Sequence, residues 1–322
     1  MRIHQPSGRW KLGLGLSFLT VFMWGLLPMA LQITLQGMDG YTITWYRFLV
    51  AALLLGSYLA LRGGLPRLRG LGPSVSILLV VVTLGLGANY VLYILGLSYT
   101  SAGAAQVLVQ LAPALAMIGA LVLFRERFVK AQWFGLFVLA SGMVLFFHDR
   151  LDQVLGRSGG HYSLGMLLIL LAAISWAMYA LAQKQLLSVM SSAAVLVVVY
   201  FGSVLLLLPT ASPGSVLRLD ALRFWLLLFA ALNTVIAYGA FSEALAHWEA
   251  SRVNAVLSLT PIATLLMIRI GSTLWPGVVP AEPLTVPSSV GATLVVVGSI
   301  TIALGQPTNG ILSLNNKSRG ES

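Results

Sequence analysis

A set of polar and aromatic side chains lies deep within apolar stretches of the chain, where a polar group needs a partner or a cavity. The members are Trp24, Asn89, Tyr90, Gln106, Gln110, Trp176, Tyr179, Asn233, Tyr238 and Asn254. Amides offer hydrogen-bond donors and acceptors, and aromatic rings stack on flat or apolar solutes. These residues predict an uncharged, aromatic-lined cavity for a small solute. The alternative is that each amide joins two helices by a hydrogen bond.

Members of this set recur at a nearly constant spacing. Trp24 and Trp176 are 152 positions apart, and Tyr90 and Tyr238 are 148 apart. Tyr179 follows Trp176 by about one helical turn and so shares its face. The spacing indicates two copies of one structural unit, as in membrane proteins built from two repeats.

Two prolines also occupy equivalent positions, because Pro113 and Pro261 are 148 residues apart. A proline inside a helix removes a backbone hydrogen bond and bends the helix, so we predict that both are hinges near the middle of their helices. Gln106 and Gln110 lie on one face just before Pro113, and Asn254 is the counterpart of Gln106. The alternative is that the bends only shape helix packing.

Charged residues are rare within the apolar stretches. Glu243 is the one carboxylate well inside such a stretch; burial would favour its protonated form, so it is a candidate to carry a coupling proton. It could instead pair with a nearby arginine or reach water. We interpret Arg47 and Arg269 as anchors whose long side chains reach the membrane surface. Glu126 and Glu282, at equivalent loop positions, are predicted to cap helices or to make loop contacts.

The composition excludes several classes of protein. The chain is 58% hydrophobic and 9% charged, with a mean hydropathy of +0.91, whereas about 25% of residues are charged in a soluble domain. Its surface must therefore face lipid. The net charge of +10 comes without an aromatic-interleaved basic patch, so no nucleic-acid partner is expected. The absence of cysteine excludes disulfides and cysteine-ligated metals.

An intramembrane enzyme is disfavoured by the positions of the reactive residues. The histidines lie in tails, in loops or at the end of an apolar stretch: His4, His148, His161 and His247. The sequence contains no HExxH pattern, no paired aspartates within apolar stretches and no phosphate loop of the GxxxxGK type. We therefore expect no catalytic residues, no metal and no cofactor.

The elements that position the candidate residues are ten apolar stretches, each long enough to be a membrane-spanning helix. They run over about 12–36, 43–61, 74–98, 101–123, 131–147, 162–186, 190–209, 222–247, 251–272 and 288–305. The runs are continuous and do not alternate, which favours helices over a barrel. We predict an N-terminal tail (1–11), a first repeat (12–147), a connecting loop (148–161), a second repeat (162–305) and a disordered C-terminal tail (306–322).

The distribution of basic residues predicts the orientation. Of 19 Lys and Arg residues, few fall in the segments assigned to the outside: Arg150, Arg157, Arg218 and Arg223. Since cytoplasmic loops are enriched in Lys and Arg, both termini are expected in the cytoplasm. Each repeat has five spans, an odd number, so the second copy is predicted to be inverted in the membrane.

Small residues form stripes on two helices. Gly135 and Gly142 recur as Gly291 and Gly298, with a spacing of 156. We interpret these stripes as surfaces for close packing within the chain; the alternative is a dimer surface. The change of spacing from 148 to 156 indicates an eight-residue insertion near 274–281.

An ordered set of motifs, present twice, resembles the ten-helix drug/metabolite transporter superfamily, specifically its EamA-type members. In the first repeat these are Phe22-Met23-Trp24-Gly25, Arg47-Phe48, Leu97-Ser98-Tyr99-Thr100-Ser101-Ala102, Leu111-Ala112-Pro113 and Arg125-Glu126-Arg127-Phe128. In the second they are Ser175-Trp176-Ala177, Leu259-Thr260-Pro261 and Glu282-Pro283-Leu284-Thr285. The similarity covers about residues 12–305. The chain departs from the family in the longer segment that precedes Glu282.

The resemblance implies transport of a small metabolite without ATP, often export of amino acids or related compounds, through a cavity formed by helices 1, 3, 4, 6, 8 and 9. We thus expect an all-α inner-membrane protein of about ten helices in two inverted five-helix repeats. It would carry a small neutral or zwitterionic solute by alternating access, as a monomer or homodimer, with protons as a candidate coupling ion. The alternatives are a facilitative uniporter or channel-like pore, and a membrane component without transport activity.

Overall fold

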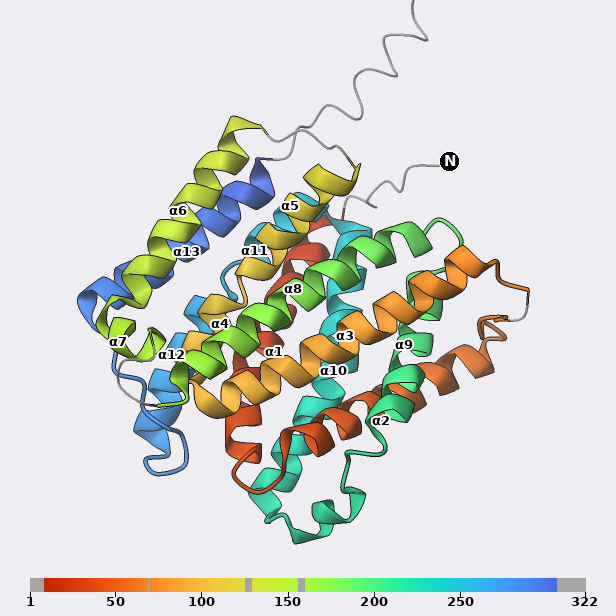
Figure 1. The fold of residues 1–322 in the computed structure, drawn as a ribbon, viewed down its shortest axis with the longest axis horizontal. Coiled ribbons are helices and arrows are strands. Elements are labelled where there is room, and N and C mark those ends of the chain that lie inside the picture. Colours follow the sequence, from red (N-terminus) through yellow and green to blue (C-terminus); the bar gives the residue numbers. More distant parts are fainter. Residues whose placement is uncertain (1–8, 69, 125–128, 156–159, 306–322) are drawn as a thin grey trace, which may run out of the picture.

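The computed structural model describes residues 9–68, 70–124, 129–155 and 160–305, and within these ranges it is helical, with no β-strand (Figure 1). The first half contains α1 (Trp10–Thr34), α2 (Gly40–Leu61), α3 (Pro73–Tyr99), α4 (Ala102–Leu108), α5 (Leu111–Phe124), α6 (Lys130–Phe146), η1 (His148–Arg150) and α7 (Leu151–Val154). The second contains α8 (Tyr162–Leu186), α9 (Ser192–Leu207), η2 (Pro213–Arg218), α10 (Ala221–His247), α11 (Ala250–Leu257), α12 (Thr260–Leu274) and α13 (Val286–Leu304).

Each of the ten predicted apolar stretches is helical in the structure. By length and composition, eight helices of the described ranges could cross a membrane, or up to nine if α6 and the short helices that follow it form one span bent by 48°. The α4–α5 and α11–α12 pairs each count as one span, and α9 is shorter, at 16 residues. Ten membrane-crossing helices in two repeats therefore stay a prediction. The expected connecting loop 148–161 contains η1 and α7.

Short polar side chains determine where several helices begin. The carboxylate of Asp39 accepts a hydrogen bond from the Thr42 N–H at 2.9 Å and caps α2, and Asp220 caps α10 through the Arg223 N–H at 2.9 Å. This backbone bond holds the pKa of Asp220 below its ordinary value, although burial opposes it. Thr285 caps α13 through the Ser288 N–H. Such caps satisfy N–H groups that have no partner within the helix.

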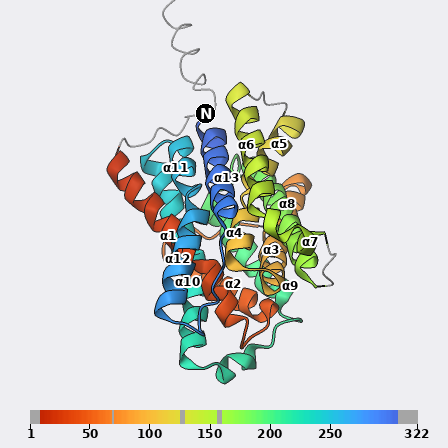
Figure 2. The same cartoon turned by 90° about the vertical axis from the view of Figure 1, so that its left-hand side faces the viewer.

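The helices pack in pairs that join the two halves of the chain (Figures 1 and 2). α1 packs along α10, and α3 packs along α8. Exchanging each helix for its counterpart in the other half turns the first pair into the second, because α1 corresponds to α8 and α10 to α3. The remaining large contact joins α6 to α13, the last helix of each half. The three largest helix contacts thus each join the first half of the chain to the second.

Glycines allow α6 and α13 to pack backbone against backbone. A Cβ atom built on Gly135 would lie 2.9 Å from the carbonyl oxygen of Gly298, and one on Gly142 would lie 2.8 Å from that of Gly291. Since real Cβ atoms do not approach so closely, only glycine fits at this interface. The prediction that these stripes pack within the chain is confirmed.

The predicted insertion forms a turn followed by an extended segment that returns to the bundle. The N–H groups of Val278 and Val279 donate to the Trp275 carbonyl, and Gly277 supplies the positive φ of +86° that the turn requires. The Val279 side chain is buried beside Gly271 of α12. The segment then brings Glu282 to the beginning of α4.

Candidate functional site

Two helices of the bundle are broken at equivalent places. α4 ends at Leu108 and α5 begins at Leu111, while α11 ends at Leu257 and α12 begins at Thr260. Pro113 and Pro261 lie near the middle of the Ala102–Leu123 and Ser251–Leu274 spans, as predicted, but each span is broken shortly before its proline; the hinge role of the two prolines stays a prediction. Each proline lies in the first turn after a break, where its missing N–H leaves no backbone bond unmade. The breaks in the two helices are therefore at 109–110 and 258–259.

The two breaks touch each other. The Gln110 side-chain amide donates a hydrogen bond to the Ser258 carbonyl oxygen at 3.3 Å, and these two residues occupy equivalent positions, 148 apart. Unwound backbone at membrane depth offers carbonyl groups that a regular helix keeps for itself. We call this contact the helix-break junction. It places one predicted residue, Gln110, between the two halves of the chain.

Aromatic residues and one arginine gather beside this junction. We call the following set the arginine cluster: Trp24 of α1, Arg47 and Phe48 of α2, Tyr90 and Tyr93 of α3, Tyr200 of α9, and Thr234 and Tyr238 of α10. Tyr93 links the cluster to the junction helix, because its hydroxyl lies 3.4 Å from Oε1 of the buried Gln106 on α4.

Arg47 is the centre of this cluster. Its side chain is buried, Nε donates to the Thr234 hydroxyl at 3.3 Å, and the guanidinium lies 4.4 Å from the centre of the Tyr90 ring. The interpretation of Arg47 as an anchor that reaches the membrane surface is wrong, because Thr234 is the central residue of α10. Arg269 is exposed near the end of α12, as an anchor requires.

Several predicted residues enter the cluster through ring contacts. Trp24 and Tyr238 meet edge to face with ring centres 5.4 Å apart, and Tyr90 lies 4.7 Å from Phe48. Tyr179 is buried in the same apolar core as Tyr90, and Trp176 packs on its edge. Helix 2, which contributes Arg47 and Phe48, was not among the helices expected to form the cavity.

Two predicted amides join helices. Asn89 of α3 donates to the Ala172 carbonyl of α8 at 2.8 Å, and Asn233 of α10 donates to the Met23 carbonyl of α1 at 2.6 Å. Both bonds occur in the two helix pairs that correspond to each other. The alternative interpretation, helix joining, describes these contacts. Asn254 is exposed on α11, and no contact in the described residues brings it to the arginine cluster.

Glu243 lies on the surface of the bundle. Its side chain is 61% exposed, and its Oε1 lies 3.1 Å from Nε2 of His247. The prediction that Glu243 is buried, on which proton coupling through this residue rested, is therefore wrong. The partner of Glu243 is a histidine instead of an arginine. We expect that Glu243→Gln leaves the dependence of transport on a pH gradient unchanged. Uptake into proteoliposomes with and without the gradient checks this; loss of the dependence would restore a coupling role.

A second polar cluster closes the end of the bundle that carries Glu282, here called the Glu282 end. The Glu282 carboxylate accepts hydrogen bonds from the Ser101 hydroxyl at 2.5 Å, the Gly103 N–H at 2.9 Å and Nη1 of Arg150 at 3.2 Å. Its side chain is 4% exposed. The prediction that Glu282 caps a helix is confirmed, since Ser101 and Gly103 begin α4; Glu126 lies outside the described residues. No pattern in the sequence indicated that Arg150 would pair with Glu282.

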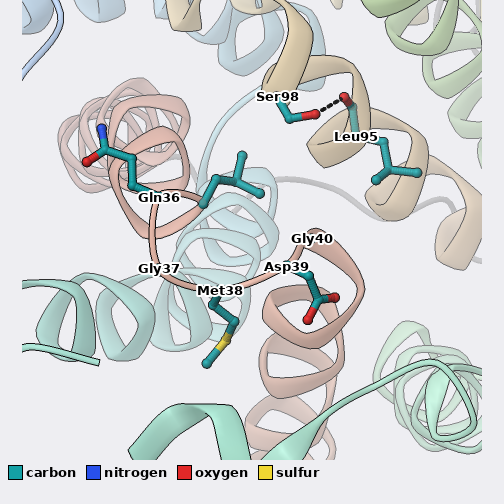
Figure 3. Close-up of a pocket in the computed structure, with 8 residues that line it drawn as sticks. Gln36, Gly37, Met38, Asp39, Gly40, Leu95 and Ser98 are labelled. Carbon is teal, nitrogen blue, oxygen red and sulfur yellow. Dashed lines mark hydrogen bonds between the residues drawn. The ribbon is translucent and has the colours of Figure 1, made fainter. Parts of the chain in front are cut away.

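The same end carries an open pocket of about 490 Å³ between the α1–α2 turn and the last turn of α3. Figure 3 shows Gln36, Asp39 and Ser98 around it. None of the predicted site residues lines this pocket. In the ranges that the structure describes, no three His, Asp or Glu side chains gather where they could hold a metal ion.

Comparison with known proteins agrees with this architecture. The model of the EamA-like transporter family matches the chain twice, over residues 11–148 and 163–304. An uncharacterized inner membrane transporter, YhbE of Escherichia coli, is 36% identical over 94% of both chains. An uncharacterized transporter of Haemophilus influenzae is 35% identical over 91% of this chain and 95% of its own.

A crystal structure of another protein has the same fold, with a TM-score of 0.60 and 17% identity over 91% of this chain and 97% of that one. The family match and the relatives indicate a membrane transporter and not an enzyme. From the two family matches and the identity to YhbE, the chain belongs to the EamA-like transporter family.

Proposed function

We propose that this protein is a secondary transporter that carries a small neutral or zwitterionic metabolite, such as an amino acid or a related compound, out of the cell without ATP. Alternating access between two inverted five-helix repeats would expose a central site to each side in turn. The observation that carries the proposal is the helix-break junction, where Gln110 of one half contacts Ser258 of the other. Two broken helices in contact give each half a place to bend at the site.

Three features support the inverted repeats. The family model matches each half separately. The α1–α10 and α3–α8 contacts correspond to each other under exchange of the halves, and so do the Gly135–Gly298 and Gly142–Gly291 contacts between α6 and α13. In this arrangement the Glu282 end faces outward, and both termini lie in the cytoplasm of a bacterial-type cell, as the bias of basic residues predicts.

Counterflow into proteoliposomes tests the proposal. Proteoliposomes that contain the purified protein are loaded with an unlabelled amino acid, amine, nucleoside or sugar. Uptake of the same compound in labelled form is then measured. A carrier shows transient accumulation of label above equilibrium when the trans side is loaded, whereas a channel-like pore does not. No accumulation with any class of solute, from protein that elutes as a single folded species, would contradict the proposal.

The arginine cluster gives a mutational prediction for the same assay. We expect Trp24→Ala to reduce counterflow at least about tenfold, because it removes the ring that packs against Tyr238 and one wall of the cluster. Trp225→Ala is the matched control, since Trp225 is 63% exposed on the surface of α10. Equal rates for the two variants, at equal amounts of folded protein, would remove Trp24 from the site.

A further inference from the structure

We propose that Arg47 binds the carboxylate of the transported solute, so that the substrate class is small carboxylates with an apolar or aromatic side group. This inference rests on the proposed transport function; it identifies the carboxylate that a zwitterionic solute carries as the group that is recognised, and it adds small organic acids to the solutes proposed above. The positive charge of Arg47 has no counter-ion among the residues that the structure describes. A guanidinium always carries its charge and has five N–H donors, and Arg47 is only 4% exposed.

The hydrogen bonds of Arg47 leave most of these donors unused. Nε donates to Thr234, a neutral hydroxyl, and the other contact is the face of the Tyr90 ring. Among the residues that the structure describes, no acceptor pairs with the two terminal nitrogens. Leaving a buried charge without a partner is costly, so proteins rarely do it outside functional sites.

The chain itself supplies no anion for Arg47 in its described ranges, because each carboxylate there lies at or near the end of a helix. Those with partners elsewhere are Asp39 with Thr42, Asp149 with Thr285, Asp220 with Arg223, Glu243 with His247, Glu249 with Arg252 and Glu282 with Arg150. Asp152 belongs to α7, in the connecting segment. The counter-ion of Arg47 is therefore expected from outside the chain.

The surroundings of Arg47 define what else the anion carries. The guanidinium lies 4.4 Å from the centre of the Tyr90 ring, and Tyr200 and Tyr238 pack against Phe48 and Trp24 of the same cluster. Trp24 and Phe48 add apolar ring surface. A planar guanidinium holds a carboxylate by two parallel bonds. A small acid with an apolar group can bind the guanidinium through its carboxylate and contact the aromatic rings through its apolar group.

Arg47 is also placed where a transported solute would pass. It bridges α2 to the centre of α10, and Tyr93 connects its surroundings to Gln106 on α4, one turn before the helix-break junction. A carboxylate bound here would touch helices from both halves of the chain. Its binding and release can then be coupled to bending at the junction.

The test uses two probes that differ only in charge: 3-phenylpropionate and its neutral amide, 3-phenylpropanamide. Binding to the purified protein in detergent is measured by isothermal titration calorimetry. We expect the acid to bind at least about tenfold more tightly than the amide. In Arg47→Gln this preference should disappear, while Arg47→Lys should retain part of it because the charge remains.

Arg269→Gln is the matched control, because it removes an arginine whose side chain is exposed near the end of α12, outside the arginine cluster, and it should keep the preference for the acid. A purely structural role of Arg47 would weaken both probes equally. The proposal is overturned if the native protein binds the two probes equally or binds neither, or if folded Arg47→Gln still prefers the acid. Because this is a binding assay, its failure leaves counterflow as a separate test of the proposed function.

Discussion

Replacing Gly291 by alanine is expected to separate α6 from α13 and to destabilise the protein by about 3 kcal/mol, at the upper end of ordinary overpacking. The new Cβ would lie 2.3 Å from the backbone nitrogen of Phe146 and 2.8 Å from the carbonyl oxygen of Gly142. Backbone atoms cannot turn away as a side chain can, so the two helices must move apart. Thermal unfolding of the purified protein should show a melting temperature lower by about 5–10 °C.

Gly239→Ala is the matched control for this substitution. Gly239 also lies inside a long helix, α10, but a Cβ there would meet nothing within 4 Å. Alanine favours helix over glycine, so this variant should be as stable as the native protein or slightly more so. A Gly291→Ala protein that melts with the control would show that the α6–α13 contact is looser than described.

Replacing Glu282 by alanine is expected to loosen the Glu282 end and to cost about 3–5 kcal/mol, the range for removing one partner of a buried ion pair. The substitution leaves the Arg150 guanidinium, 19% exposed, without its counter-ion. It also frees the Gly103 N–H at the beginning of α4. If this end opens during transport, the variant should also expose it more often.

The two effects are measured by thermal unfolding and by the labelling rate of a cysteine placed at Ser101, next to Glu282. In Glu282→Ala the melting temperature should fall, and the cysteine should be labelled faster. Glu249→Ala is the control, because Glu249 and Arg252 form a pair in which both side chains are more than half exposed. Such pairs contribute little. Identical behaviour of the two variants would mean that the contacts of Glu282 do not stabilise this end of the bundle.

Much of the fold could be predicted because lipid leaves the chain few choices. Backbone groups in a membrane must bond within a helix, so continuous apolar runs located every long helix, and α8 has the predicted bounds of 162–186. The glycine stripes marked the α6–α13 contact for the same reason, since only small residues allow such an approach. The positions of the breaks were missed, because a proline signals a helix interruption without telling on which side the helix ends.

The candidate site was predicted less completely. A polar residue in a membrane helix needs a hydrogen-bond partner, but its type does not tell whether that partner is a solute in a cavity or a neighbouring helix. Asn89 bonds to a backbone carbonyl of α8. Arg47 was misjudged because it lies near the end of its helix in the sequence, which suggested that its side chain reaches the membrane surface. The side chain points toward α10 instead, and this direction depends on how the helices pack. Its charge in an apolar run was the available signal.

The inverted arrangement of the two repeats is tested most directly by cysteine labelling from each side of the membrane. The natural chain has no cysteine, and both Gln36 and Ser188 are exposed in equivalent turns, 152 positions apart. Intact cells carrying Gln36→Cys or Ser188→Cys are treated with a membrane-impermeant maleimide. We expect labelling at position 36 in intact cells and at position 188 only after the inner membrane is opened. Labelling of both positions from one side would contradict the account.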